Sequence, residues 1–247
     1  MNVWYYFAMD EKHRFGGTLG EEYDLFKLSV PHIGEFEKAI ADEVTLNFKD
    51  SKAFEIKVLE LGSGTGITTK FLLEADPRVH IVAVDNEKVM MNQISENIKF
   101  WQEEYRVELH LEDIFEYLKS VDDGFFDVVA SGYVLHNFSQ TFRNKILADI
   151  YRVLKPDGLF VNGDKYARDD ASEQEKVFAE QVRRFDVYDS IGRSDYKAEW
   201  IKHYQEDERP EVVFKEGNAK KYMESLGFKN VQSTYRKMME AVIVGTK

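Results

Sequence analysis

The stretch VLELGSGTG at positions 58–66 places three glycines, Gly62, Gly64 and Gly66, directly after an apolar run that contains one acid, Glu60. Glycine tolerates positive φ angles and lets the backbone approach a ligand closely. A helix that begins after such a loop offers its first backbone N–H groups to an anionic group. The stretch therefore predicts a loop that wraps a small charged ligand.

Two common phosphate-binding motifs do not fit this loop. The dinucleotide fingerprint needs its third glycine where this chain has Ile67, and a Walker loop needs a Gly-Lys-Ser/Thr sequence that is absent here. A carboxylate at the end of an apolar strand is costly without a partner. For Glu60 this favours a ligand-site role over a purely structural one.

The elements that must position the loop alternate between strands and helices. Apolar or alternating runs predict strands at 55–62, 80–85, 105–113, 126–132 and 159–165. Helical patterns between them include 67–75 and 87–101. This alternation predicts an α/β fold with a Rossmann-like, seven-stranded, mostly parallel and doubly wound sheet. Residues 228–247 predict a closing C-terminal antiparallel hairpin.

Two segments depart from this alternation of strands and helices. Residues 1–50 predict a helical N-terminal cap, with an amphipathic helix that begins near Pro31. Residues 166–209 are charged and aromatic without a strand pattern, which predicts a helical lid insertion. We therefore expect residues 51–165 and 210–247 together to form the sheet-containing core domain. Because ligands bind beyond the carboxyl ends of the strands in open α/β sheets, we expect cap and lid to form a roof over the ligand.

The glycine loop resembles motif I of the class I S-adenosylmethionine-dependent methyltransferases, whose signature is E/D-x-G-x-G-x-G. Further family motifs follow in order, so that the resemblance covers roughly residues 54–165. It implies S-adenosyl-L-methionine as the methyl donor and S-adenosyl-L-homocysteine as the product. The resemblance implies cofactor contacts from Glu60, Gly62, Ser63, Gly64, Gly66, Asp85, Asn86, Asp113, Ile114, Ser131 and Tyr23.

Four of these positions have specific implied roles. Asp85 closes the second strand, where the family's acid accepts hydrogen bonds from the ribose hydroxyls. Asp113 would contact the adenine amino group, and Ile114 would pack on the ring. Tyr23 would lie over the methionine end. The alternatives are that the two aspartates cap the helices that follow them and that Ile114 is a core residue.

Methyl transfer is an in-line displacement that mainly needs alignment of the two reactants and exclusion of water. A general base is required only when the nucleophile arrives protonated. His136 follows the fourth strand and Asp164 lies at the end of the fifth, so these two are the candidate catalytic residues. Packing is the alternative for the histidine, and a turn or cap role for the aspartate. Further candidates in the roof are His13, Trp200, His203 and Tyr204.

A second resemblance competes with the first. Residues 19–36 resemble the N-terminal segment of the carboxy-S-adenosylmethionine synthases of tRNA modification. Three anchor residues of that family are replaced here, by Leu28, Ile33 and Tyr204. We therefore expect ordinary S-adenosylmethionine and a methyltransferase that acts on a small molecule. A synthase-like enzyme and a non-catalytic cofactor-binding module are the alternatives.

The composition limits the classes of molecule that this chain is expected to bind. The net charge of −12 makes nucleic acid an unlikely partner, because such a surface repels phosphates. Cysteine is absent, which excludes disulfides and a cysteine nucleophile and fits the cytoplasm. No apolar run approaches the ~18 residues of a membrane span, and no clustered His/Asp spacing indicates a metal. The oligomeric state cannot be predicted.

Overall fold

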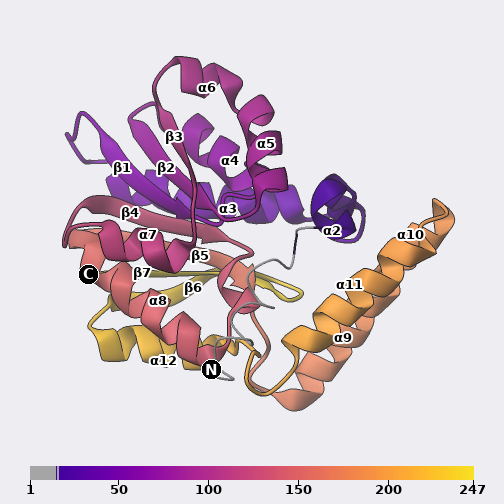
Figure 1. Cartoon of the computed structure of the whole chain (residues 1–247). Coiled ribbons are helices and arrows are strands. Elements are labelled where there is room, and N and C mark those ends of the chain that lie inside the picture. Colours follow the sequence, from indigo (N-terminus) through magenta and orange to yellow (C-terminus); the bar gives the residue numbers. More distant parts are fainter. Residues whose placement is uncertain (1–14, 16) are drawn as a thin grey trace, which may run out of the picture.

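The computed structural model describes residue 15 and residues 17–247. Its seven-stranded sheet has the order β3-β2-β1-β4-β5-β7-β6 (Figure 1). The first five strands are parallel, whereas β7 runs antiparallel to both β5 and β6. The strands are β1 (Ile56–Leu61), β2 (Val79–Asp85), β3 (Val107–Leu111), β4 (Phe126–Gly132), β5 (Leu154–Lys165), β6 (Lys229–Lys237) and β7 (Glu240–Thr246). The predicted fold class is confirmed.

Helices cover both faces of this sheet. On one face α3 (Ile33–Phe48) packs against α4 (Ile67–Ala75) and also contacts β5 and β7. On the other face α7 (Ile114–Ser120) and α12 (Glu216–Leu226) both contact α8 (Gln140–Val153). The sheet is therefore buried on both sides, which is why its central strands read as nearly continuous apolar runs.

The direction of winding changes between two neighbouring strands. The chain proceeds outward from β1 to β2 and β3, and then returns to place β4 on the other side of β1. Helices that follow β1 and β4 consequently diverge to opposite faces of the sheet. A crevice opens at the carboxyl ends of these two strands, where open α/β sheets bind their ligands.

Two predicted boundaries are wrong. The helix expected at 87–101 is broken at Ile98, whose φ of −117° and ψ of 15° separate α5 (Lys88–Asn97) from α6 (Lys99–Glu103). The fifth strand begins at Leu154 rather than at residue 159, because Leu154 already pairs with Phe126 before the register shifts. Residues 155–158 (KPDG) lie within this irregular stretch, where Asp157 has a φ of 61°.

Two groups of helices, one that precedes β1 and one that follows β5, meet beyond the sheet. The N-terminal ones are α2 (Thr18–Glu21) and the 3-10 helix η1 (Tyr23–Leu28). After β5 come α9 (Ala171–Arg184), α10 (Val187–Ser190) and α11 (Ser194–Asp207), and α9 and α11 project from the core side by side (Figure 1). The division into cap, core and lid stays a prediction.

Polar contacts join these two helical segments. The Ser29 hydroxyl lies 2.9 Å from the Tyr188 hydroxyl, and the Tyr196 hydroxyl donates to the Glu22 carbonyl at 2.9 Å. The roof candidate His13 lies outside the described residues. Among the helices that the structure describes, none is long and apolar enough to cross a membrane.

Candidate functional site

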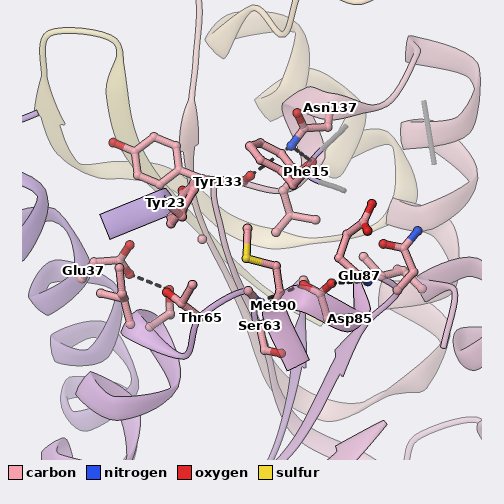
Figure 2. A pocket seen from close by; sticks show the side chains of 18 of the residues that line it. Phe15, Tyr23, Glu37, Ser63, Thr65, Asp85, Glu87, Met90, Tyr133 and Asn137 are labelled. Carbon is pink, nitrogen blue, oxygen red and sulfur yellow. Dashed lines mark hydrogen bonds between the residues drawn. The ribbon is translucent and has the colours of Figure 1, made fainter. Parts of the chain in front are cut away.

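A cavity of about 120 Å³ lies at the crevice between β1 and β4 (Figure 2). It is bordered by the glycine loop, the start of α4 and the segments that follow β2 and β4. Its lining residues are Phe15, Tyr23, Glu37, Gly62, Ser63, Gly64, Thr65, Ile67, Thr68, Asp85, Asn86, Glu87, Met90, Ile114, Gly132, Tyr133, Val134, Asn137 and Phe138. Seven of the eleven residues expected to contact the cofactor line this cavity: Tyr23, Gly62, Ser63, Gly64, Asp85, Asn86 and Ile114.

All three glycines of the loop have left-handed backbone conformations. The φ angles of Gly62, Gly64 and Gly66 are 65°, 55° and 85°. A Cβ at Gly62 would overlap the Val134 side chain, with Cγ1 at 2.9 Å. Gly66 does not line the cavity but is the N-cap of α4, and a Cβ there would meet Ile94 Cγ1 at 2.7 Å. The spacing of the glycines thus reflects packing behind the loop as well as access to it.

The two cavity-lining glycines predict a matched pair of stability measurements. Both Gly62→Ala and Gly64→Ala place a side chain at positive φ, which costs roughly 1–2 kcal/mol. Only the Cβ at Gly62 meets a neighbour, since nothing lies within 4 Å of one at Gly64. Overpacking then adds about 1–3 kcal/mol to the loss at Gly62. Urea denaturation of both variants measures the difference, and equal losses would contradict this expectation.

Asp85 is held by backbone groups on both sides. Its Oδ2 accepts a hydrogen bond from the Gly64 N–H at 2.8 Å, and its Oδ1 accepts one from the Glu87 N–H at 2.8 Å. Burial raises the pKa of Asp85, although these two hydrogen bonds oppose the rise. A carboxylate has more acceptor sites than these two bonds occupy. Asp85 can therefore accept hydrogen bonds from the hydroxyl groups of a ligand in the cavity.

Of the next two candidates, Asp113 caps a helix and Ile114 lines the cavity. Asp113 is the N-cap of α7, where its Oδ1 accepts hydrogen bonds from the Phe115 and Glu116 N–H groups at 3.0 and 3.3 Å. Its neighbour Ile114 lines the cavity. The capping role that the sequence left open for Asp113 is therefore present, and an adenine contact stays a prediction.

Ser131 and Glu60 lie on strands behind the cavity wall. The Ser131 hydroxyl donates a hydrogen bond to the side-chain carbonyl oxygen of Asn162 on β5. Glu60 is buried on β1, and neither residue lines the cavity. Their roles in cofactor binding stay predictions, and any such role for Glu60 would be indirect.

A second, smaller cavity of about 10 Å³ adjoins the first. This inner cavity has room for about one water molecule, and is lined by Phe15, Tyr23, Phe26, Tyr133, His136, Lys165, Trp200, His203 and Tyr204. Phe15, Tyr23 and Tyr133 line both cavities and therefore separate them. Tyr133 has a φ of 58°, and such a conformation in a bulky residue points to a functional constraint at the end of β4.

His136 and Asp164 form a buried pair beside the inner cavity. His136 lies on the 3-10 helix η2 (Leu135–Asn137), and its Nδ1 is 2.5 Å from Asp164 Oδ1. The backbone N–H of His136 also donates a hydrogen bond to Asp164 Oδ2 at 3.2 Å. Burial lowers the pKa of His136, while the Asp164 carboxylate opposes this shift. A neutral imidazole whose Nδ1–H is held by a carboxylate keeps Nε2 as the basic nitrogen.

A second group of buried polar side chains, from β5 and α11, lies at the inner cavity. The Lys165 ammonium forms an ion pair with Asp207 on α11 and lies 3.8 Å from the centre of the Tyr204 ring. His203 Nε2 is 3.5 Å from Asp207 Oδ2. In the described part of the chain His136, His203 and Asp207 are close enough to hold a metal ion, but the Lys165 ammonium already supplies a positive charge to this carboxylate. Lys165 and Asp207 were not foreseen from the sequence.

Glu37 is another residue that sequence reasoning missed. It lies on α3, lines the larger cavity, and its Oε2 accepts a hydrogen bond from the Thr68 hydroxyl at 2.6 Å. Burial raises the pKa of Glu37 to about 7. The available signal was an acid on the buried face of an amphipathic helix, between Ile33 and Ile40.

Comparison with known proteins identifies the core. Residues 58–158 match the family model described as a methyltransferase domain. A demethylmenaquinone methyltransferase of Leptospira interrogans is 31% identical over 163 residues, which are 64% of this chain and 64% of that protein. A carboxy-S-adenosyl-L-methionine synthase of Helicobacter hepaticus is 27% identical over 143 residues, which are 58% of this chain and 57% of that protein. The chain thus spans less than two thirds of either relative.

A solved structure agrees with these sequence matches. The crystal structure of a SAM-dependent methyltransferase from Aquifex aeolicus has a TM-score of 0.53 and 17% sequence identity, covering 83% of this chain and 88% of the other. At this identity the likeness shows the fold. The family model and the curated relatives confirm the family resemblance that the ordered motifs indicated.

Proposed function

The chain carries a class I S-adenosylmethionine-dependent methyltransferase domain, and we propose that it transfers a methyl group from S-adenosylmethionine to a small acceptor. The observation that carries this proposal is the pair of adjoining cavities that share Phe15, Tyr23 and Tyr133. The larger cavity suits the cofactor and the inner one the acceptor. The net charge of −12 disfavours a nucleic-acid acceptor, and a cytoplasmic location is part of the proposal.

The lining of the larger cavity fits the proposed cofactor. A Cβ at Gly62 would collide with Val134, which itself lines the cavity, so this part of the lining requires glycine. Asp85 offers acceptor oxygens for hydroxyl groups, and Ile114 offers an apolar surface for a flat ring. When bound, S-adenosylmethionine would supply an electrophilic methyl group on its sulfonium sulfur. The role of this part of the chain is to hold and orient that group.

The lining of the inner cavity supports an acid–base role on the acceptor side. Asp164 holds His136 so that Nε2 is the basic nitrogen, and this atom can take a proton from an acceptor seated beside it. The aromatic roof excludes water, with Phe26 and Trp200 stacked at 4.4 Å between ring centres. Because the inner cavity has room for only about one water molecule, we infer that the roof opens to admit an acceptor.

Mass spectrometry tests this function directly. The purified protein is analysed for retained nucleosides and is then incubated with S-adenosylmethionine and a panel of carboxylic acids, phenols, amines and thiols. We expect S-adenosylmethionine or S-adenosylhomocysteine to co-purify and one acceptor class to gain a methyl group. If the protein neither retains nor binds either nucleoside, the proposal fails.

Replacing Asp85 should weaken cofactor binding. Asp85→Ala removes acceptors for hydroxyl groups and the anchor of the Gly64 N–H. Hydrogen bonds to a charged group contribute about 1.5–3 kcal/mol, so we expect the dissociation constant for S-adenosylhomocysteine to rise about 10- to 100-fold. Isothermal titration calorimetry measures it, with the exposed Asp122→Ala as the control. An unchanged dissociation constant for Asp85→Ala would rule out this role.

A synthase-like activity is the second candidate. One of the relatives described above is a carboxy-S-adenosyl-L-methionine synthase. The Lys165 ammonium lines the inner cavity, where it could pair with a carboxylate. The same mass spectrometry separates the two functions, since a carboxylated nucleoside retained by the protein would favour the synthase.

A further inference from the structure

The buried carboxyl of Glu37 lines one end of the larger cavity, and that of Glu60 lies behind the cavity wall. Glu37 reaches the cavity from α3, and its carboxyl is bonded to the Thr68 hydroxyl at the start of α4. A Cβ at Gly132 would lie 3.4 Å from Glu37 Oε2, which places this carboxyl directly over the end of β4. Figure 2 shows Glu37 on the side of the pocket opposite Asp85 and Glu87. Acidic groups therefore occupy both ends of the site.

Glu60 lies on the same face of the sheet as Glu37. It alternates with Ile56 and Val58, both of which belong to the core on the α3 side. Its partners on the adjacent strands are Ala83 and Ala130, whose small side chains leave room for the carboxyl. Within the described residues no group forms a well-aligned hydrogen bond with either of its carboxyl oxygens.

Neither carboxyl has a basic partner. In residue 15 and residues 17–247, no Lys, Arg or His side chain forms an ion pair with Glu37 or Glu60. Burial raises the pKa of Glu60 to about 8, with the neighbouring Glu37 and Asp85 adding to the rise and Thr69 opposing it. In the empty site this burial favours the neutral, protonated form of both carboxyls, whereas a cation bound in the cavity beside Glu37 would stabilise its carboxylate form.

The chemistry of the carboxyl limits what this cation can be. A carboxylate that accepts hydrogen bonds needs N–H or O–H donors, and a sulfonium has none. A primary ammonium has three donors and a full positive charge. In S-adenosylmethionine the ammonium group lies at the amino-acid end, opposite the ribose and adenine. Glu37 and Asp85 likewise lie on opposite sides of the pocket (Figure 2).

We propose that Glu37, with Glu60 behind it, is the binding site for the primary ammonium group of the cofactor. This inference rests on the proposed function, because it assigns a residue to one end of the same ligand. The helix that precedes the sheet then contributes directly to cofactor recognition. Glu37 and Thr68 hold the amino-acid end, whereas Asp85 holds the nucleoside.

A pair of ligands tests the assignment without measuring activity. S-adenosylhomocysteine carries the ammonium group, and methylthioadenosine has the same nucleoside and thioether without the amino-acid end. For Glu37→Gln we expect the dissociation constant of S-adenosylhomocysteine to rise about 10- to 100-fold, while that of methylthioadenosine stays the same. Isothermal titration calorimetry measures both ligands on wild type and variant.

Two further variants complete the experiment. Glu43→Gln makes the same change on α3 at a residue that does not line the cavity, and it should alter neither affinity. Glu37→Asp keeps a shorter carboxylate, so it should recover part of the lost affinity for S-adenosylhomocysteine. Circular dichroism verifies that each variant is folded.

The possible failures are distinguishable. If wild type binds both nucleosides and Glu37→Gln leaves S-adenosylhomocysteine binding unchanged, the ammonium assignment is wrong while the proposed function stands. Equal weakening of both ligands in Glu37→Gln also overturns the assignment, because it would show a general distortion of the cavity. If wild type binds neither nucleoside, the proposed function fails and the assignment fails with it.

Discussion

His136→Gln should lower the turnover number by about 10²- to 10⁴-fold, the range that a positioned general base contributes. Glutamine keeps a polar side chain of similar size but cannot take a proton at neutral pH. The dissociation constant of S-adenosylhomocysteine should change little, because His136 lines the inner cavity and not the larger one. The measurement is steady-state methylation of the acceptor identified from the panel, at saturating S-adenosylmethionine.

The pH profile separates proton transfer from packing. A general base works in its neutral form, so the rate should rise with pH and level off above the pKa of His136. Because burial lowers this pKa below its usual value, the rate should level off below about pH 6.5. His136→Gln should remove this rising limb, while His110→Gln on β3 should leave it unchanged. A variant with wild-type turnover would show that His136 only packs.

Sequence reasoning located the strands well because buried parallel strands read as apolar runs. For β4 the predicted range of 126–132 matches the structure. The prediction of strand ends failed where turn-forming residues lie within a segment that pairs with a neighbouring strand. The residues Lys155, Pro156, Asp157 and Gly158 favour a turn, yet the backbone already pairs with β4 at Leu154. No Pro or Gly marks the helix break at Ile98 in the sequence. Ile98 is the C-cap of α5, and its side chain is buried.

The site was predictable where its residues are close in sequence. The glycine loop and Asp85 belong to one β-α-β unit, so their spacing alone indicates that they meet. Lys165 and Asp207, by contrast, come from β5 and α11, and Glu37 meets Thr68 across two helices. Only the tertiary fold shows such pairs. Ser131 illustrates the reverse case, since its strand position was predicted but its Asn162 partner was not.

The Lys165–Asp207 ion pair joins β5 to α11, and we expect it to contribute strongly to the free energy of unfolding. Both side chains are almost fully buried, at 4% and 3% exposure. Removing one partner of a buried pair leaves a charge without compensation, which typically destabilises a protein by about 3–5 kcal/mol. We expect Lys165→Met to lower the free energy of unfolding by an amount in this range. Urea denaturation measures it from the midpoint and the slope of the transition.

A double variant distinguishes charge from packing. Lys165→Met combined with Asp207→Asn removes both charges while keeping the size of each side chain, so most of the lost stability should return. The exposed pair Lys38 and Asp42 is the control, because Lys38→Met removes an ion pair that solvent already screens. If the double variant were as unstable as Lys165→Met alone, the methylene chain of Lys165 against the Tyr204 ring would be the stabilising contact. Recovery would instead show that the lid is held to β5 by the neutralisation of one buried carboxylate, and an acidic acceptor that competes for Lys165 would then loosen the lid as it binds.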